Sequence, residues 1–229
     1  MFRSMESHSC RGAASPRPLV LASSSPRRRD LLANLRLPFS VVSADVPESP
    51  LPGETPVQMA ERLALTKARA VIRMGAVPPT SLVVGADTVV IYRGRALGKP
   101  TTPEEAVAML RKLRGRAHRV VSAVAVVDPQ TDDAMVRATT TRVQMRPMTD
   151  EEIARYVASG DPLDKAGAYA IQNRAFHPVD SIAGCYSNVV GLPLCTLAGM
   201  LAQFGESVPE GWRAGATNCA CTRLAGEAG

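Results

Sequence analysis

Between residues 18 and 205, runs of apolar residues alternate with segments in which apolar positions recur every three or four residues. Continuous apolar runs bounded by turn residues are typical of buried strands, whereas the wider spacing is typical of helices that bury one face. The expected strands are 18–22, 37–46, 81–92, 119–127 and 135–145. The expected helices begin at Pro26, Pro56, Pro103, Asp150 and Pro193. This alternation of strands and helices predicts an α/β fold.

The ends of these helices carry capping residues. Thr55, Thr102 and Thr149 each stand three residues before a glutamine or a glutamate. In this arrangement the two side chains satisfy free backbone N–H groups of the first helical turn. Gly75 and Gly115 follow two of the helices, and glycine accommodates the left-handed backbone with which many helices end. The helix boundaries are therefore predicted from local chemistry.

Length and composition bound the domain organisation. With 229 residues, 45% of them hydrophobic, the chain is long enough for one domain with a substantial core, and no linker-like stretch divides it. We expect a disordered extension at 1–17, one folded domain at 18–205 and a loose tail at 206–229. The start of the chain is rich in arginine and serine, which leaves an organellar transit segment as the alternative to a disordered extension.

Charge and cysteine content narrow the classes of partner and compartment. The net charge of +6 suits a partner that is a nucleic acid, a lipid surface or a small polyanion. The placement of the cations along the chain is what distinguishes these three classes of partner. No apolar run approaches the roughly 20 residues that span a bilayer, so we expect no membrane partner. The five cysteines are scattered and odd in number, which favours a reducing compartment, and we expect a cytoplasmic protein.

The first candidate site is the strand-to-helix junction Ser23-Ser-Ser-Pro-Arg-Arg-Arg29. A helix N-terminus presents free N–H groups and the positive end of the helix dipole, which together bind anions. Arg27 and Arg28 stand at that end against the dipole, which costs stability unless an anion is bound. Phosphate binding is one interpretation, and a solvated basic turn that serves a kinase or a nucleic acid is the other.

Two charged residues stand at positions that are otherwise apolar. Lys67 lies between Leu63 and Val71 on the apolar stripe of its helix, so it needs either a buried anion or a route by which its ammonium group reaches water. Asp87 interrupts a β-branched strand, which is tolerated when a metal or a lysine pairs with the carboxylate. Such an aspartate can hold Mg²⁺ or act as a general base, and a turn-capping role is the alternative.

Further cations occur in turns whose sequences carry little information on their own. They are Lys99 in Leu-Gly-Lys-Pro and Lys165 in the small-residue segment that ends at Gln172. The chain contains neither a GxxxxGK[ST] loop nor a GxGxxG turn, which argues against P-loop and Rossmann sites. If these lysines converge with the basic junction and Lys67, they match the charges of a triphosphate, while Asp87 holds a metal or activates water.

Several segments resemble, in this order, the Maf family of the Maf/Ham1-like, ITPase-like nucleotide pyrophosphatases. They are LASSSPRR, the helix that ends in Lys67-Ala68, GADTVV, LGKP, LRGRAHRVVSAV, DKAGAYAIQ and NVVGLPL, and they span 18–205. The resemblance implies a long twisted mixed sheet with flanking helices in two lobes and a central cleft. It also implies cleavage of a nucleoside triphosphate between its α- and β-phosphates, a divalent metal cation (Mg²⁺ or Mn²⁺) and a homodimer.

The resemblance also implies roles for individual residues. Asp87 is expected to be the catalytic acid/base and the metal-associated carboxylate, with Lys99 and Glu48 as further catalytic residues. The residues expected to contact the phosphates are Ser23, Arg27, Arg28, Lys67, Lys99 and Lys165. The residues linked to substrate choice are Arg27, Thr88 and Gln172.

The segment from Asp164 to Gln172 is similar to that of the pyrimidine-preferring branch of the family, whose substrates are dTTP, UTP and modified pyrimidine nucleotides. The other branch prefers 7-methyl-GTP. A glutamine amide donates and accepts hydrogen bonds together, so it can pair with thymine or uracil, although it would also suit other bases. Asn173 departs from the pattern, which often has glycine there, but asparagine tolerates a positive φ.

The predicted function is hydrolysis of dTTP or UTP to the monophosphate and pyrophosphate, and two other classes stay open. One is a nucleotide-binding regulator of cell division with weak or no hydrolysis, since Maf-like proteins are associated with septum formation. The other is a basic nucleic-acid binder. Because the chain is 4% aromatic and its cations are spread among turns, we expect no specific nucleic-acid partner.

Overall fold

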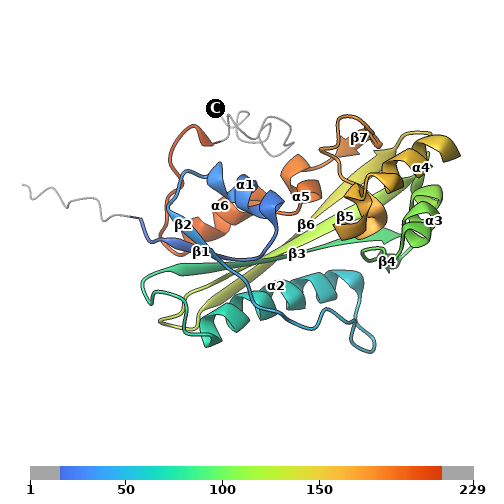
Figure 1. Cartoon of the computed structure of the whole chain (residues 1–229). Helices are drawn as coiled ribbons and strands as arrows, with labels where there is room; N and C mark the ends of the chain where they lie inside the picture. Colours follow the sequence, from blue (N-terminus) through green and yellow to red (C-terminus); the bar gives the residue numbers. More distant parts are fainter. Residues whose placement is uncertain (1–15, 213–229) are drawn as a thin grey trace, which may run out of the picture.

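Seven strands form one mixed sheet that runs the length of the molecule (Figure 1); the computed structural model describes residues 16–212. The strands are β1 (Leu19–Ala22), β2 (Phe39–Val42), β3 (Leu82–Tyr92), β4 (Arg95–Leu97), β5 (Ala117–Val127), β6 (Ala134–Met145) and β7 (Val179–Ala183). Their spatial order is β2-β1-β3-β5-β6-β7, with β4 paired to the end of β3. β1 is parallel to β2 and β3, and the other pairs are antiparallel, so the expected mixed sheet is confirmed.

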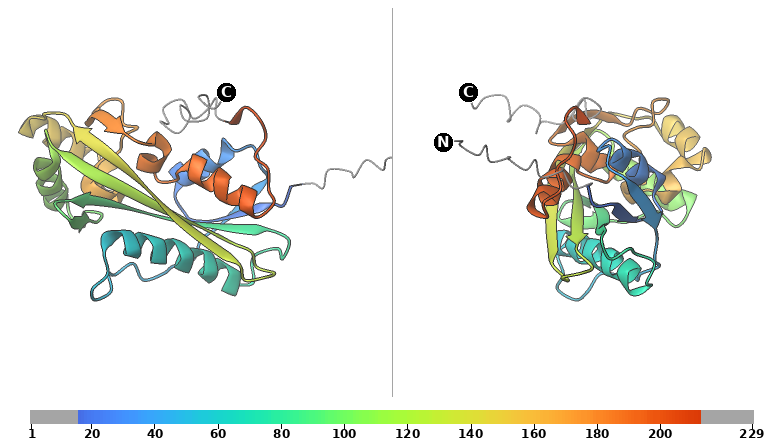
Figure 2. Two further views of the ribbon diagram at one scale, coloured as in Figure 1. Left: turned by 180° about the vertical axis from the view of Figure 1, so that it is seen from behind. Right: turned by 90° about the vertical axis from the view of Figure 1, so that its left-hand side faces the viewer.

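Helices cover both faces of the sheet. They are α1 (Pro26–Ala33), α2 (Pro56–Arg73), α3 (Pro103–Leu113), α4 (Asp150–Ala158), α5 (Tyr186–Val190) and α6 (Leu194–Gln203), with the 3-10 turns η1 (Asp161–Asp164) and η2 (Ala166–Ala168). α2 lies along one face, α1 and α6 lie on the opposite face near β1, and α3 and α4 lie at the far end of the long strands (Figures 1 and 2). The helices α1, α2, α3, α4 and α6 begin at, or within one residue of, the starts expected from the sequence.

The pleat of the strands sends alternate side chains into different cores. Leu19 and Leu21 pack with α1 and α6, whereas Val20 packs with α2. Both faces of β1 are therefore buried, which is why its sequence is a continuous apolar run. Along β3 the same alternation places Asp87 on the face that α2 covers and Thr88 on the opposite face, beside α1.

Gly85 allows α2 to approach β3 closely. A Cβ atom at this position would lie 2.1 Å from the carbonyl oxygen of Ala64 in α2, a distance that no side chain tolerates. The absence of a side chain at Gly85 is what permits this close approach. It brings Lys67, one helical turn beyond Ala64, next to Asp87.

The sheet supports two lobes. One apolar cluster fills the far end around α3, α4 and β7, and other clusters fill the near end under α1, α6 and α2. The long strands β3, β5 and β6 connect the two ends. The sequence pattern did not predict β4, β7 or α5, because these elements are only three to five residues long and carry no periodic apolar signal.

The first and last described residues pack against this domain. The backbone N–H of Arg17 donates to Glu206 (3.1 Å), and Trp212 is buried in the core that α6 forms with the sheet. Glu206 and Trp212, which fall within the expected tail, are thus anchored to the domain, whereas residues 207 and 209–211 between them are exposed. The rest of that tail and most of the expected N-terminal extension lie outside the described residues, at 213–229 and 1–15. Within 16–212, no helix combines the length and the apolarity needed to cross a bilayer.

Candidate active site

A cleft between the two lobes brings together the residues that the sequence analysis singled out. One cavity of about 380 Å³, called the main cavity because it contains most of the predicted residues, is lined by α1, α2 and β3 on one side and by residues 164–172 on the other. A second cavity of about 410 Å³ adjoins it and shares Arg28, Glu48, Lys67 and Lys99 with it. The predicted residues are Arg27, Arg28, Glu48, Lys67, Asp87, Thr88, Lys99, Lys165 and Gln172 in the main cavity and Ser23 in the second.

Lys67 joins two carboxylates in this cleft. Its Nζ atom lies 2.7 Å from Oδ1 of Asp87 and 2.6 Å from Oε1 of Glu48. The side chains of Lys67 and Asp87 are only 13% and 10% exposed, so this pair is largely withdrawn from water, whereas Glu48 is half exposed. Lys67 therefore has the anion that its place on an apolar stripe requires, and Asp87 has the lysine partner that a buried carboxylate needs.

Glu48 extends this chain of charges toward Lys99, whose Nζ atom lies 4.0 Å from Oε2. Burial on its own raises the pKa of Glu48, but Lys67, followed by Lys99 and Arg28, outweighs it and holds the pKa below its ordinary value. Glu48 is therefore ionised at neutral pH. The side chain of Lys99 is largely exposed, which leaves its ammonium group able to meet a ligand in the cleft.

Arg28 ties α1 to β3 and to the loop before α6. Nε donates to the carbonyl of Gly191 (3.0 Å), Nη1 to Oγ of Ser23 (3.3 Å) and Nη2 to Oγ1 of Thr88 (3.1 Å). Burial lowers the pKa of Arg28, and Asp87 acts in the opposite direction; an arginine nevertheless stays charged at neutral pH. The guanidinium group is therefore held in a fixed orientation at the N-terminal end of α1, where an anion is expected.

Asn188 and Ser122 support the site, although the sequence analysis did not single them out. Oγ1 of Thr88 and Oγ of Ser122 face each other across β3 and β5 and are 2.8 Å apart. The buried Asn188 accepts from the backbone N–H of Ser122 (2.9 Å) and donates to the carbonyl of Val120 (3.0 Å). These bonds fix α5 against β5 and so place Gly191. A single buried amide gives no periodic signal by which the sequence could have marked it.

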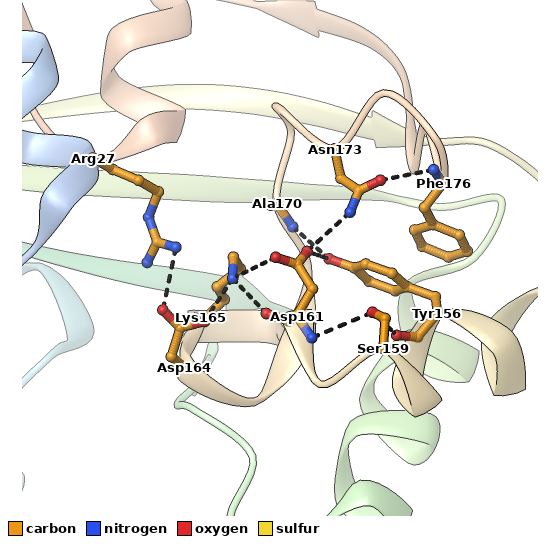
Figure 3. Close-up of polar contacts among 9 residues, drawn as sticks. All are labelled: Arg27, Tyr156, Ser159, Asp161, Asp164, Lys165, Ala170, Asn173 and Phe176. Carbon is orange, nitrogen blue, oxygen red and sulfur yellow. Dashed lines mark hydrogen bonds and ion pairs between the residues drawn. The ribbon is translucent and has the colours of Figure 1, made fainter.

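The far lobe supplies two carboxylates beside the cleft (Figure 3). Nη1 of Arg27 lies 3.3 Å from Oδ2 of Asp164, which joins α1 to η1. The Nζ atom of Lys165 contacts Oδ1 of Asp164 (2.6 Å), Oδ1 of Asp161 (3.0 Å) and the carbonyl oxygen of Asp161. These three acceptors match the three N–H donors of an ammonium group. Lys165 thus lines the cleft while its donors are directed at the far lobe.

Gln172 lines the main cavity with an exposed side chain, next to Asn173. The sequence allowed a positive φ at Asn173, but this residue does not adopt one. The left-handed backbone of this segment occurs instead at Gly167 (71°) and Ala168 (61°). The side chain of Asn173 donates to Asp161 and accepts from the backbone N–H of Phe176, so it forms hydrogen bonds within the far lobe.

The fold and the cleft define an α/β protein whose site combines paired carboxylates with cations suited to a polyanionic ligand. The family model described as Maf-like protein matches residues 18–204. The chain belongs to the Maf family.

Relatives in this family span nearly the same length. A dTTP/UTP pyrophosphatase of Pelotomaculum thermopropionicum is 52% identical over 190 residues, which cover 83% of this chain and 98% of the relative. A dTTP/UTP pyrophosphatase of Geobacter sulfurreducens is 48% identical over 187 residues, which cover 82% and 96%. Among solved structures, the Ham1 protein of Staphylococcus aureus aligns with a TM-score of 0.46 and 18% identity over 82% of this chain and 100% of that chain.

Proposed function

We propose that this protein is a nucleoside triphosphate pyrophosphatase that hydrolyses dTTP and UTP to the monophosphate and pyrophosphate. The observation that carries the proposal is the Glu48–Lys67–Asp87 chain of charges in a cleft lined by further cations. The names of the two bacterial relatives, both dTTP/UTP pyrophosphatases, support it. A cell-division regulator without hydrolysis is not favoured, because the relatives that match most of the chain are named dTTP/UTP pyrophosphatases.

The donor set of the cleft suits a divalent cation. Asp87 and Glu48 reach the same Nζ atom of Lys67, so their carboxylates lie close together. Residues 16–212 contain no group of three or more His, Cys, Asp or Glu side chains that could hold a metal ion by themselves. Mg²⁺ is commonly held by one or two carboxylates together with substrate phosphates and water. We propose that Asp87 and Glu48 hold Mg²⁺ or Mn²⁺ with the triphosphate, where the cation supplies neutralising charge.

In the proposed reaction, Asp87 accepts a proton from the water that attacks the α-phosphorus. A bond forms between the water oxygen and this phosphorus, while the bond to the oxygen that bridges the α- and β-phosphates breaks and pyrophosphate leaves with the electron pair. Lys67 balances the charge of Asp87 where that carboxylate is withdrawn from water. Arg28, the N-terminus of α1 and Lys99 stabilise the charge that develops on the departing pyrophosphate.

Ser23 serves in this proposal as a hydrogen-bond donor to a phosphate and not as a nucleophile. Within the described residues, its Oγ atom accepts hydrogen bonds from the backbone N–H of Ser25 (3.2 Å) and from Arg28 (3.3 Å). Neither partner can take up the proton of the hydroxyl group, so the activation that a nucleophilic serine needs is lacking there.

Base choice is assigned in this proposal to the far wall of the cleft. The exposed amide of Gln172 pairs with the N3–H and O4 edge of uracil or thymine, because an amide offers both an acceptor and a donor. Arg27 and Thr88 are the further residues proposed for substrate choice, and Lys165 is considered below. The homodimer and the cytoplasmic location stay predictions, which sedimentation of the purified protein and cell fractionation test.

Pyrophosphate release from a panel of nucleoside triphosphates tests the function. The panel contains UTP, dTTP, CTP, GTP and 7-methyl-GTP, each with Mg²⁺ or Mn²⁺. Preferential release from UTP and dTTP is expected. Saturable binding of UTP without pyrophosphate release would favour the regulator, and preference for 7-methyl-GTP would keep the class of enzyme while overturning the pyrimidine assignment.

A further inference from the structure

Asp161 lies at the centre of a hydrogen-bonded cluster behind the residues that line the far side of the cleft (Figure 3). Its Oδ2 atom accepts from Oη of Tyr156 (2.7 Å) and from Nδ2 of Asn173 (3.1 Å). Its Oδ1 atom lies 3.0 Å from Nζ of Lys165. Tyr156 belongs to α4, whereas Lys165 and Asn173 lie at the two ends of the segment 165–173. One carboxylate therefore joins α4 to both ends of a segment that lines the cleft.

Tyr156 anchors this cluster in the core of the far lobe. Its Oη atom accepts the backbone N–H of Ala170 (3.1 Å), and its ring stacks on that of Phe176 with centroids 3.9 Å apart. Burial, with the hydrogen bond to Asp161, raises the pKa of Tyr156, so the phenol stays a donor. Burial alone raises the pKa of Asp161, but its hydrogen bonds from Tyr156, Lys165 and Asn173 outweigh this and lower it. The carboxylate therefore stays an acceptor at neutral pH.

We propose that Asp161 is a positioning residue for base recognition, because it holds the segment 165–173 so that Gln172 faces the base in the cleft. This inference rests on the proposed function. It also assigns Lys165 to the cluster, since the three N–H donors of this lysine are directed at Asp161 and Asp164 instead of at a phosphate.

Asp161→Asn is the test variant, because an amide of nearly the same shape cannot accept hydrogen bonds from three donors at once. We expect the ratio of kcat/KM for UTP over GTP to fall by about tenfold, the effect of losing one charge-assisted hydrogen bond. The change should appear in KM for UTP, with kcat altered by less than about threefold, because Asp161 touches no reacting atom.

A second variant and a control make the result specific. Asn173→Asp keeps the acceptor for the N–H of Phe176 but removes the donor to Asp161, so it should lower the ratio as well. Asp180→Asn removes an exposed carboxylate on β7 that lines neither cavity, and it should keep the wild-type ratio.

Lys165→Met separates positioning from phosphate binding. If Lys165 binds a phosphate, this substitution weakens the binding of all nucleoside triphosphates alike and leaves the ratio of UTP to GTP unchanged; that result would overturn the assignment of Lys165 to the cluster. If Lys165 positions the segment 165–173, the substitution lowers the ratio, which is the result we expect.

The ratio is also measured as equilibrium binding of the α,β-methylene analogues of UTP and GTP, so that it is defined without turnover. A wild-type protein that binds these analogues but releases no pyrophosphate from UTP would contradict the proposed function. The ratio of the two binding constants would still decide the role of Asp161. If Asp161→Asn and Asn173→Asp both melt like the wild type and keep its ratio, Asp161 does not position the base-reading segment.

Discussion

Gly85→Ala tests how the packing of α2 on β3 positions Lys67 and Asp87, the charged residues proposed to act in catalysis. An alanine Cβ would lie 2.1 Å from the carbonyl oxygen of Ala64, whereas real Cβ atoms essentially never come closer than 3.0 Å. The helix must therefore retreat by about 0.9 Å, the difference between these distances, because a packed interior has no spare volume. Lys67 is one turn along the same helix. If its ammonium group moves equally, the 2.7 Å contact with Asp87 lengthens to about 3.6 Å, beyond hydrogen-bonding distance.

This displacement has a cost in stability and in rate. Overpacking combined with a weakened buried ion pair should lower the free energy of unfolding by about 3 kcal/mol. Misplacement of catalytic groups by about 1 Å lowers rates by about 100-fold, so pyrophosphate release should fall by that order. Gly85 lines neither cavity, so a loss of turnover would have to act through α2.

Urea denaturation and the initial rate of pyrophosphate release are the two assays. The matched control is Gly199→Ala in α6, where a Cβ atom would meet nothing within 4 Å. That substitution should leave turnover unchanged and stabilise the protein by up to about 1 kcal/mol, because alanine restricts the unfolded chain. A Gly85→Ala protein with the stability and turnover of the wild type would show that the close packing of α2 on β3 does not position Lys67.

Two further predictions concern titrating groups. Lys67→Met removes the cation that lowers the pKa of Glu48, so this pKa should rise. The acidic limb of the pH profile of kcat/KM should then move to higher pH. An unmoved limb would contradict the role proposed for Glu48 in the cleft. Burial lowers the pKa of His118 to about 4, below its unfolded value of about 6.5. The neutral His118 therefore contributes fully to the free energy of unfolding above pH ~6.5. This contribution, at most about 3 kcal/mol, is lost as the pH falls through ~4. Melting temperatures across this range should fall more steeply for the wild type than for His118→Gln, and parallel curves would refute the effect.

Much of the fold was predictable because the helices carry their end signals in the sequence. Thr55 and Thr149 form complete capping boxes, and the helices that they begin, Pro56–Arg73 and Asp150–Ala158, start where the sequence places them. The short helix α5 was not predicted, since its first residue follows Cys185, which forms no side-chain cap. Such elements form because the surrounding core orders them, and a local pattern does not record that.

The gathering of charges in the cleft was predictable, but their pairing was not. The inward position of Lys67 indicated either an anion or a route to water for its ammonium group. The strand position of Asp87 indicated a metal or a lysine as its partner, with turn capping as the alternative. Their contact depends on how closely α2 approaches β3, which is a property of tertiary packing. Glu48 lies in a loop without periodicity, so only the family resemblance pointed to it. The cluster around Asp161 depends on the path of two loops and left no signal in the sequence.

In the proposed reaction, water attacks the α-phosphorus and Asp87 takes up the proton of that water. Hydrolysis of UTP in ¹⁸O-labelled water, followed by mass spectrometry of the products, shows which phosphorus the water attacks. We predict ¹⁸O in the nucleoside monophosphate and none in the pyrophosphate. We also predict that Asp87→Asn binds UTP but turns it over at least about 100-fold more slowly. Label in the pyrophosphate or release of orthophosphate in its place would contradict attack at the α-phosphorus, and near-normal turnover by Asp87→Asn would contradict the role of Asp87.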